Sequence, residues 1–390
     1  MPRVDVLVVG AGPAGAVAAR ELKHRAPHLD VVLVERDRAV GAPVRCAEGV
    51  GDVGLREFAA PDGSDWYLRR ITRVIFLAPD GTEVKVAERD VGWVLDRTRF
   101  DAHLAAEAGR EGAEVWIGSE VTGLCRTGDA WDAALRTSRG PTTVQARIVI
   151  AADGVESMVG RWAGIDTRVP ARDMESCAQY IVHNIEFDPD AIYLHFGDAV
   201  APGGYAWIFP RGVGVANVGL GIVALKAGQR GAREWLDAYL AARFPHGVTV
   251  GYTVGGVIAG TTIRKTYTDG VLVAGDAAHM INPLSGGGIV NAMKAGRLAA
   301  EVAVEALARG DTSEQSLATY HERWMKLLGE DHLRYYRIKQ ALEELPDAFY
   351  DKLARTVNKI PESRRTLGRI FASALVRHPQ LIPIAARFFV

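Results

Sequence analysis

The chain has 390 residues, 48% of them hydrophobic and 24% charged, so it can bury a large core and is not a disordered protein. Its formal net charge of −1 argues against a general nucleic-acid-binding protein. Cys46, Cys125 and Cys177 are widely spaced, which excludes a cysteine zinc cluster and fits a reduced compartment. The chain has no run of about 18 apolar residues, so we expect no membrane-spanning helix.

The N-terminus reads as a βαβ unit. The apolar run V-D-V-L-V-V at 4–9 ends at a glycine turn and predicts a buried parallel strand. A helix is expected over 13–25 and a second strand over 31–35.

The turn between this strand and helix carries G-A-G-P-A-G. Gly10 permits the tight turn, Gly12 lets a pyrophosphate approach the backbone, and Gly15 lets the helix pack on the strand. Glu35 ends the second strand, where its carboxylate can accept hydrogen bonds from ribose hydroxyls. Strand, helix, strand and acid together predict a dinucleotide site, although this motif alone does not separate FAD from NAD.

The rest of the chain contains segments with mixed helix and strand signals and one strand-rich region. A helix is expected over 97–112, followed by strands near 115–124, 131–137 and 142–150. Between about 172 and 260, strand residues and frequent turns indicate an inserted antiparallel sheet. The remaining expected elements are a buried strand at 271–274, a long helix at 287–309 and a mostly helical segment at 313–390.

A second cofactor motif lies at 271–289. Asp276 follows the buried strand and can bond the hydroxyls of a ribityl chain. Gly286, Gly287 and Gly288 open a helix whose dipole can stabilise negative charge on a reduced flavin. The alternative is a surface loop before a helix, but it explains neither the buried strand nor the spacing. This motif indicates FAD.

Several motifs together resemble a known family. G-A-G-P-A-G, A-A-D-G at 151–154 and G-D-A-A at 275–278 resemble the FAD oxidoreductases of the p-hydroxybenzoate hydroxylase superfamily. Within it, the chain is similar to the geranylgeranyl reductase branch over about residues 1–310. The motifs that carry this second resemblance are R-C-A-E-G at 45–49, L-D-R-T-R-F-D at 95–101, Y-A-W-I-F-P at 205–210 and P-L-S-G-G-G-I at 283–289.

The resemblance implies an α/β fold with a Rossmann-type FAD-binding domain, an inserted antiparallel-sheet substrate domain and a helical C-terminus. The FAD-binding domain is expected at 1–70, 91–171 and 260–330. The substrate domain is expected at 71–90 and 172–259, and the helical region at 331–390.

The resemblance also implies a set of cofactor contacts. Besides the three fingerprint glycines, FAD is expected to contact Ala14, Glu35, Arg36, Cys46, Ala47, Gly49, Arg97, Val121, Asp153, Gly154, Asp276, Gly286, Gly287, Gly288 and Ile289. The alternative for Arg97 is an ordinary solvated charge at a helix start. No second Rossmann unit is present, so the reductant is expected to be transiently bound NAD(P)H, or a ferredoxin-type protein or quinol.

The strand Y-A-W-I-F-P places Tyr205, Trp207 and Phe209 on one face by its period of two. An aromatic wall suits a long apolar substrate such as a prenyl chain, and family members have this motif by the substrate cavity. An aromatic core stripe is the alternative for each residue.

The family reaction saturates isolated C=C bonds, which needs a hydride, a proton and a dry, oriented site. We hypothesise that Cys46 lies beside the flavin ring and gates the site or donates a proton; a buried, inert cysteine is the alternative. His279 is a second candidate acid by residue type, and a structural hydrogen bond is its alternative role.

The sequence therefore predicts an FAD-dependent reductase of geranylgeranyl chains on membrane-lipid precursors. The alternatives are a flavin-dependent monooxygenase or halogenase acting on a small aromatic, and an FAD-bearing electron-transfer subunit. The expected location is cytoplasmic, with peripheral membrane contact through the C-terminus. From Lys352 to Val390 there are eight basic residues and one acid, and this segment either docks on anionic lipid or packs on its own domain.

Overall fold

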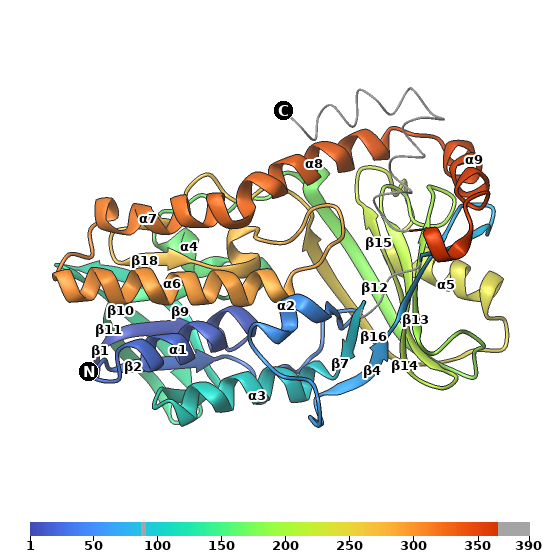
Figure 1. Cartoon of the computed structure of the whole chain (residues 1–390). Coiled ribbons are helices and arrows are strands. Elements are labelled where there is room, and N and C mark those ends of the chain that lie inside the picture. Colours follow the sequence, from blue (N-terminus) through green and yellow to red (C-terminus); the bar gives the residue numbers. More distant parts are fainter. Residues whose placement is uncertain (87–90, 366–390) are drawn as a thin grey trace. The chain divides into compact units, whose positions relative to one another are not determined.

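The computed structural model describes residues 1–86 and 91–365, and the chain divides into two compact units (Figure 1). The first unit comprises Met1–Val44, Arg97–Val169 and Gly260–Leu333. The second comprises the described residues of 45–96, together with Pro170–Ala259 and residues 334–365.

The first unit is built on a mixed sheet whose centre is parallel. The strand order is β17-β18-β11-β1-β2-β8, and the β9–β10 hairpin joins β11 through β10. The strands are β1 (Arg3–Val9), β2 (Val31–Glu35), β8 (Glu114–Ile117), β9 (Ser119–Thr127), β10 (Ala130–Thr137), β11 (Gly140–Ala151), β17 (Tyr267–Thr268) and β18 (Val271–Val273). The pairs β2–β1, β1–β11 and β11–β18 are parallel.

Helices cover this sheet. They are α1 (Pro13–Arg25), α3 (Arg97–Arg110), α4 (Met158–Trp162), α6 (Ile289–Arg309) and α7 (Glu314–Trp324), and a π-helical turn (Met325–Gly329) leads from α7 into α8 (Glu330–Glu343). Small residues let α1 and α6 pack at close range, since a Cβ at Gly296 would lie 2.0 Å from the Ala14 carbonyl oxygen. The apolar run of β1 is buried, with Val6, Leu7 and Val8 fully inaccessible, as a central parallel strand requires.

The second unit contains a seven-stranded sheet in the order β16-β12-β15-β14-β13-β5-β6. Its strands are β5 (Arg73–Leu77), β6 (Glu83–Val86), β12 (Met174–His183), β13 (Ala191–Phe196), β14 (Tyr205–Gly212), β15 (Val215–Val223) and β16 (Val248–Ile258). One face forms an apolar core with α5 (Ala232–Arg243), where Ile208, Val218 and Leu236 meet. The alternate residues of each strand form the opposite face.

A smaller sheet, β3-β7-β4, completes the second unit with α2 (Asp52–Arg56) and α9 (Asp347–Val357). Its strands are β3 (Gly49–Gly51), β4 (Tyr67–Ile71) and β7 (Gly92–Leu95).

The expected fold class is confirmed. The compact units differ from the expected domain bounds, because residues 45–70, 91–96 and 334–365 all group with the second unit. Residues 45–70 group with the second unit because β3 and β4 both pair with β7. The helix α5 lies within the region expected to form an inserted antiparallel sheet and was not predicted. No described helix is both long and apolar enough to span a bilayer.

Candidate active site

Four parallel strands of the first unit end at one edge of the sheet, and a predicted cofactor residue follows each. Gly10 follows β1, Glu35 ends β2, Asp153 lies just beyond β11, and Asp276 lies just beyond β18. Because the carboxyl ends of parallel strands meet at the same edge, the structure brings these four residues together. Ligands of open α/β sheets bind at this edge.

The fingerprint glycines serve different purposes. A Cβ at Gly10 would lie 2.3 Å from the Ala152 carbonyl oxygen, and one at Gly15 would lie 1.9 Å from the Gly10 carbonyl oxygen. A Cβ at Gly12 would have no protein atom within 4 Å. Gly10 and Gly15 are therefore required by the protein's own packing, whereas the open space over Gly12 fits the approach of a pyrophosphate at the start of α1.

Glu35 organises the backbone around this turn. Its Oε2 accepts a hydrogen bond of 2.9 Å from the Ala11 N–H, and its Oε1 accepts one of 2.9 Å from the Asp37 N–H. The next residue, Arg36, forms an ion pair with Glu156, with Nη1 2.5 Å from Oε2. This exposed pair connects the end of β2 to the turn after β11.

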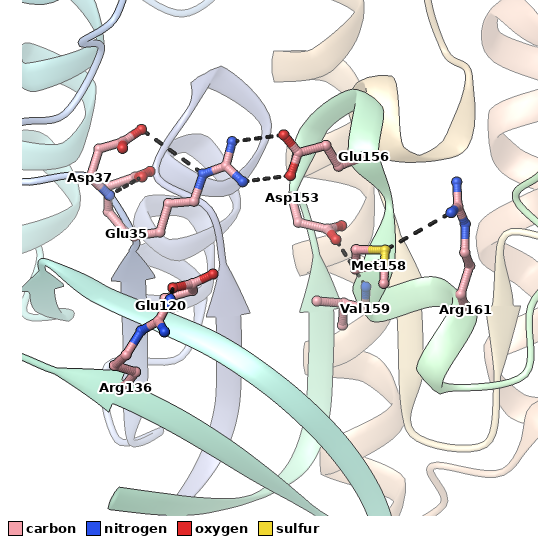
Figure 2. Close-up of polar contacts among 10 residues, drawn as sticks. Glu35, Asp37, Glu120, Arg136, Asp153, Glu156, Met158, Val159 and Arg161 are labelled. Carbon is pink, nitrogen blue, oxygen red and sulfur yellow. Dashed lines mark hydrogen bonds and ion pairs between the residues drawn. The ribbon is translucent and has the colours of Figure 1, made fainter. Parts of the chain in front are cut away.

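The two carboxylate oxygens of Asp153 differ in their hydrogen bonding. Its Oδ2 accepts a 2.9 Å hydrogen bond from the Val159 N–H (Figure 2). Its Oδ1 is buried and accepts no hydrogen bond from the described residues, and burial raises the pKa of this carboxyl. An acceptor in that state fits a hydroxyl donor of a bound nucleotide. Gly154 follows with a φ of 72° and begins the 3-10 turn Gly154–Glu156.

Asp276 and Arg97 form the other half of this site. Surroundings of low polarity raise the pKa of Asp276, and the charge of Arg97 opposes that shift. Arg97 begins α3, and its Nε and Nη2 each donate a 2.7 Å hydrogen bond to the buried Asp101. Arg97 is thus not a solvated surface charge.

The glycine triplet lies beside Asp276. A Cβ at Gly288 would lie 3.4 Å from Asp276 Oδ1, and α6 begins at the next residue, Ile289. Gly286 has a φ of 69°, and Gly287 donates a 3.3 Å hydrogen bond to Ser285 Oγ. The helix N-terminus therefore opens beside the carboxylate, as the motif requires.

Three further predicted residues are placed by the same elements. Ala14 is buried in the first turn of α1, and Val121 is buried in β9. His279 is buried with a φ of 56°, and its N–H donates a 3.0 Å hydrogen bond to the Asp276 carbonyl, which closes the 3-10 turn. This backbone role is structural, and the proposed acid role of His279 stays a prediction.

The segment Cys46–Gly49 belongs to the second unit, where polar side chains of the large sheet hold its backbone. Gln179 Nε2 donates to the Cys46 carbonyl at 3.1 Å, and Asn217 Nδ2 donates to the Ala47 carbonyl at 3.2 Å. Asn217 also donates to the buried Glu48 carboxylate at 2.7 Å, which Arg211 pairs as well.

Gly49 ends this segment against the aromatic strand. A Cβ at Gly49 would lie 2.5 Å from Phe209 Cε2. The structure therefore brings the predicted loop and the predicted aromatic strand together on one face.

Four aromatic rings form a row on that face. Centroid distances are 5.9 Å from Phe76 to Phe196, 5.7 Å from Phe196 to Tyr205 and 6.1 Å from Tyr205 to Trp207. The row crosses β5, β13 and β14, whose other faces point into the α5 core. We call these four residues the aromatic row.

On the neighbouring strand β15, the residue that pairs with Trp207 is a glycine, Gly219. A Cβ at Gly219 would lie 2.5 Å from Trp207 Cζ2, so only glycine leaves room for the indole. The indole Nε1 donates a 2.8 Å hydrogen bond to Gln179 Oε1 on β12. Sequence analysis missed Gln179, Asn217 and the glycines of β15, although the alternation G-L-G at 219–221 was a usable signal.

Comparisons with known proteins agree with this geometry. The family model of the FAD binding domain matches residues 3–195 and 257–327, and that of the geranylgeranyl reductase catalytic domain matches residues 173–257. A digeranylgeranylglycerophospholipid reductase of Methanosphaerula palustris is 40% identical over 386 residues, covering 97% of this chain and 96% of that protein. The chain belongs to the geranylgeranyl reductase family of FAD-binding proteins.

Solved structures extend this result. A geranylgeranyl bacteriochlorophyll reductase-like protein of Thermoplasma acidophilum matches with a TM-score of 0.91 and 32% identity, covering 98% of this chain and 100% of that one. A flavin-dependent brominase matches with a TM-score of 0.73 and 17% identity, covering 97% and 99%, and shows a shared fold alone. Three of the four residues of the aromatic row, Phe196, Tyr205 and Trp207, lie within the matched catalytic domain.

Proposed function

We propose that this protein is an FAD-dependent reductase that saturates isolated C=C bonds of geranylgeranyl chains, with a membrane-lipid precursor as substrate. The observation that carries the proposal is the aromatic row, whose Trp207 indole occupies space left by glycines of β15. The other unit of the chain carries the residues predicted to bind a dinucleotide. Membership in the geranylgeranyl reductase family supports the same conclusion.

The chain's residues have distinct tasks in this proposal. Gly12 and the N-terminus of α1 hold the pyrophosphate, while Glu35 and Asp153 accept hydrogen bonds from cofactor hydroxyls. Asp276 and the N-terminus of α6 hold the ribityl chain and flavin ring. Bound FAD, once reduced, supplies the hydride. The aromatic row offers apolar contact without hydrogen-bonding demands, so it holds a prenyl chain in extended form and excludes water.

The test is anaerobic turnover. The purified holoprotein is reduced with dithionite and mixed with a digeranylgeranylglycerol phospholipid, and the product is analysed by mass spectrometry. We expect each reduced double bond to add about two mass units as the flavin is reoxidised without oxygen. Product that forms only with oxygen would instead support a monooxygenase or halogenase. Flavin that passes its electrons to an acceptor without altering the lipid would support an electron-transfer subunit.

Cys46 receives a separate test. The sequence-based hypothesis is that it gates the site or donates a proton, and its Sγ accepts a 3.2 Å hydrogen bond from the Glu48 N–H. Cys46→Ala is expected to keep its FAD and lose at least about tenfold in turnover, which corresponds to ~1.4 kcal/mol. Full turnover with full FAD content would refute the role.

The electron donor and the membrane contact are also proposals. We propose an external donor, either NAD(P)H or a reduced protein or quinol, which stopped-flow reduction of the flavin by each in turn will distinguish. The basic C-terminal segment is proposed to bind anionic lipid on the cytoplasmic membrane face. Residues 366–390 of that segment lie outside the described part of the chain. Co-sedimentation with anionic liposomes, with and without residues 363–390, is the measurement.

A further inference from the structure

A group of three ionisable side chains lies beside β12 in the second unit, and two of them are buried. Lys339 on α8 places Nζ 3.0 Å from Glu175 Oε1 and 3.4 Å from Glu343 Oε1, and donates to the Ala259 carbonyl at 3.1 Å. Lys339 is 7% exposed and Glu175 is 9% exposed. Tyr336, one turn before Lys339, donates a 2.6 Å hydrogen bond to Asp173 and fixes α8 against the start of β12.

In this charge cluster the two carboxyls share the buried ammonium of Lys339. With both carboxyls ionised, Lys339 would have to compensate two negative charges, and the charge of Glu175 would lie in a buried place, which is costly. Burial raises the pKa of both Glu175 and Glu343, and Glu343 Oε1 accepts no hydrogen bond from the described residues. Lys226 lies on the Glu343 side and favours a charge there. Of the two carboxyls, the surroundings therefore favour the protonated form more at Glu175 than at Glu343.

The two oxygens of Glu175 face different surroundings. Oε1 is at Lys339, whereas Oε2 would be 3.3 Å from a Cβ at Gly221. The same Cβ position at Gly221 lies 3.1 Å from Cys177 Sγ and 3.9 Å from Trp207 Cζ3. In the sheet, Gly221 of β15 pairs with Tyr205 of β14. Oε2 thus lies on the face of the sheet that carries the aromatic row, beside Cys177 and Trp207.

The neighbouring acids are poorer proton donors. Burial raises the pKa of the Tyr205 phenol and of the Cys177 thiol. A proton lost from either group leaves an anion that its surroundings disfavour. Glu175, in contrast, leaves a carboxylate 3.0 Å from an ammonium.

We propose that Glu175 is the acid that protonates the prenyl double bond, with Lys339 and Glu343 as the groups that hold and replace its proton. This inference rests on the proposed function. The hydride adds to one alkene carbon while the Glu175 O–H bond breaks and a C–H bond forms at the other carbon. The resulting carboxylate is stabilised by Lys339 and regains a proton from water through the cluster.

Ionisable groups surround Glu175 on each of the elements packed around it. They are Lys339, Glu343 and Tyr336 on α8, Asp173 and Cys177 at β12, Tyr205 on β14, Cys46, Lys226 after β15 and Tyr350 on α9. Lys339 lowers the pKa of Glu175, so removing the ammonium raises that pKa. The reaction needs Glu175 protonated, and turnover should therefore fall as pH rises through its pKa.

The experiment compares Glu175→Gln, Lys339→Met and the wild type as full-length holoproteins. Glu175→Gln should keep its FAD and lower lipid turnover by about 100- to 10,000-fold, the usual range for a general acid. Infrared titration of the resting protein should lose one protonated-carboxyl band in this variant. Lys339→Met should move the alkaline limb of the pH–rate profile upward by at least about one pH unit.

Glu305→Gln is the matched control, because it breaks a 2.7 Å ion pair with Arg323 on the first unit. It should change neither the band nor the limb. Wild-type turnover or an unchanged infrared band in Glu175→Gln would overturn the inference. An unmoved alkaline limb of the pH–rate profile in Lys339→Met would overturn it as well. The Lys339→Met variant provides the test if Glu175→Gln fails to fold. A wild type that reduces no lipid would overturn the proposed function instead, while the band would still report the buried proton.

Discussion

Gly12 differs from its neighbours in the reason it must be glycine. Its φ of −67° suits any residue, and a Cβ there would contact no protein atom within 4 Å. We predict that Gly12→Ala leaves the unfolding midpoint of the apoprotein unchanged or slightly raised, since the substitution restricts the unfolded chain. FAD affinity should fall at least about tenfold because the methyl group occupies the pyrophosphate position.

Gly10→Ala is the informative contrast. Its Cβ would lie 2.3 Å from the Ala152 carbonyl oxygen at a φ of 100°, so this variant should lose stability with or without cofactor. Thermal unfolding of each variant, measured with and without added FAD, separates the two effects. Wild-type FAD content in Gly12→Ala would show that the cofactor does not approach this turn.

At the scale of the element, the packing of Trp207 on β14 depends on a glycine of the neighbouring strand β15. Gly219→Ala would place a Cβ 2.5 Å from Trp207 Cζ2 and 2.6 Å from the Ala178 carbonyl oxygen. We predict a loss of about 1–3 kcal/mol in the free energy of unfolding, as for other overpacked sites. The indole should also leave Gln179, and the KM for the prenyl lipid should rise.

Gly212→Ala tests whether this effect belongs to the position rather than to glycine. Gly212 ends β14, and a Cβ there would meet no atom within 4 Å. This variant should stay within about 0.5 kcal/mol of the wild type, with an unchanged KM. Equal losses of unfolding free energy in both variants, measured by denaturant unfolding, would mean that the indole of Trp207 does not require glycine at position 219.

The elements also show which features a sequence can reveal. The fingerprint from Gly10 to Glu35 is local, so strand, turn and helix signals lie within one short stretch and support each other. Gly219 gains its meaning only from its register opposite Trp207, and the ion pair of Glu175 with Lys339 joins residues far apart in the chain. The helix α5 did have apolar residues at helical spacing, but the strand-rich segments around it masked that signal.

At the scale of the whole molecule, buried histidines should set its stability in acid. His332 is 2% exposed and packs edge-on against Trp324 with ring centroids 5.8 Å apart. Asn291 Nδ2 lies 3.2 Å from its Nε2, and its Nδ1 is buried without a hydrogen bond to any described residue. Burial lowers the pKa of His332 from 6.5 to about 4.

The folded pKa of His332 lies below its unfolded value, so the unfolded chain binds this proton first as pH falls. Stability from this residue is complete above about pH 6.5 and is lost as pH falls toward about 4. The loss amounts to about 3 kcal/mol at most, at ~1.4 kcal/mol per pKa unit. His332→Gln, whose amide oxygen can still accept from Asn291, should remove that part of the acid sensitivity.

His28→Gln is the control, because His28 is exposed. Some acid sensitivity should persist in His332→Gln, since burial also lowers the pKa of His195 and His321. Thermal unfolding midpoints at pH 7 and pH 4.5 should therefore converge most in His332→Gln and not at all in His28→Gln. If the His332 variant loses as much stability between these pH values as the wild type, the uptake of protons that unfolds this protein occurs elsewhere.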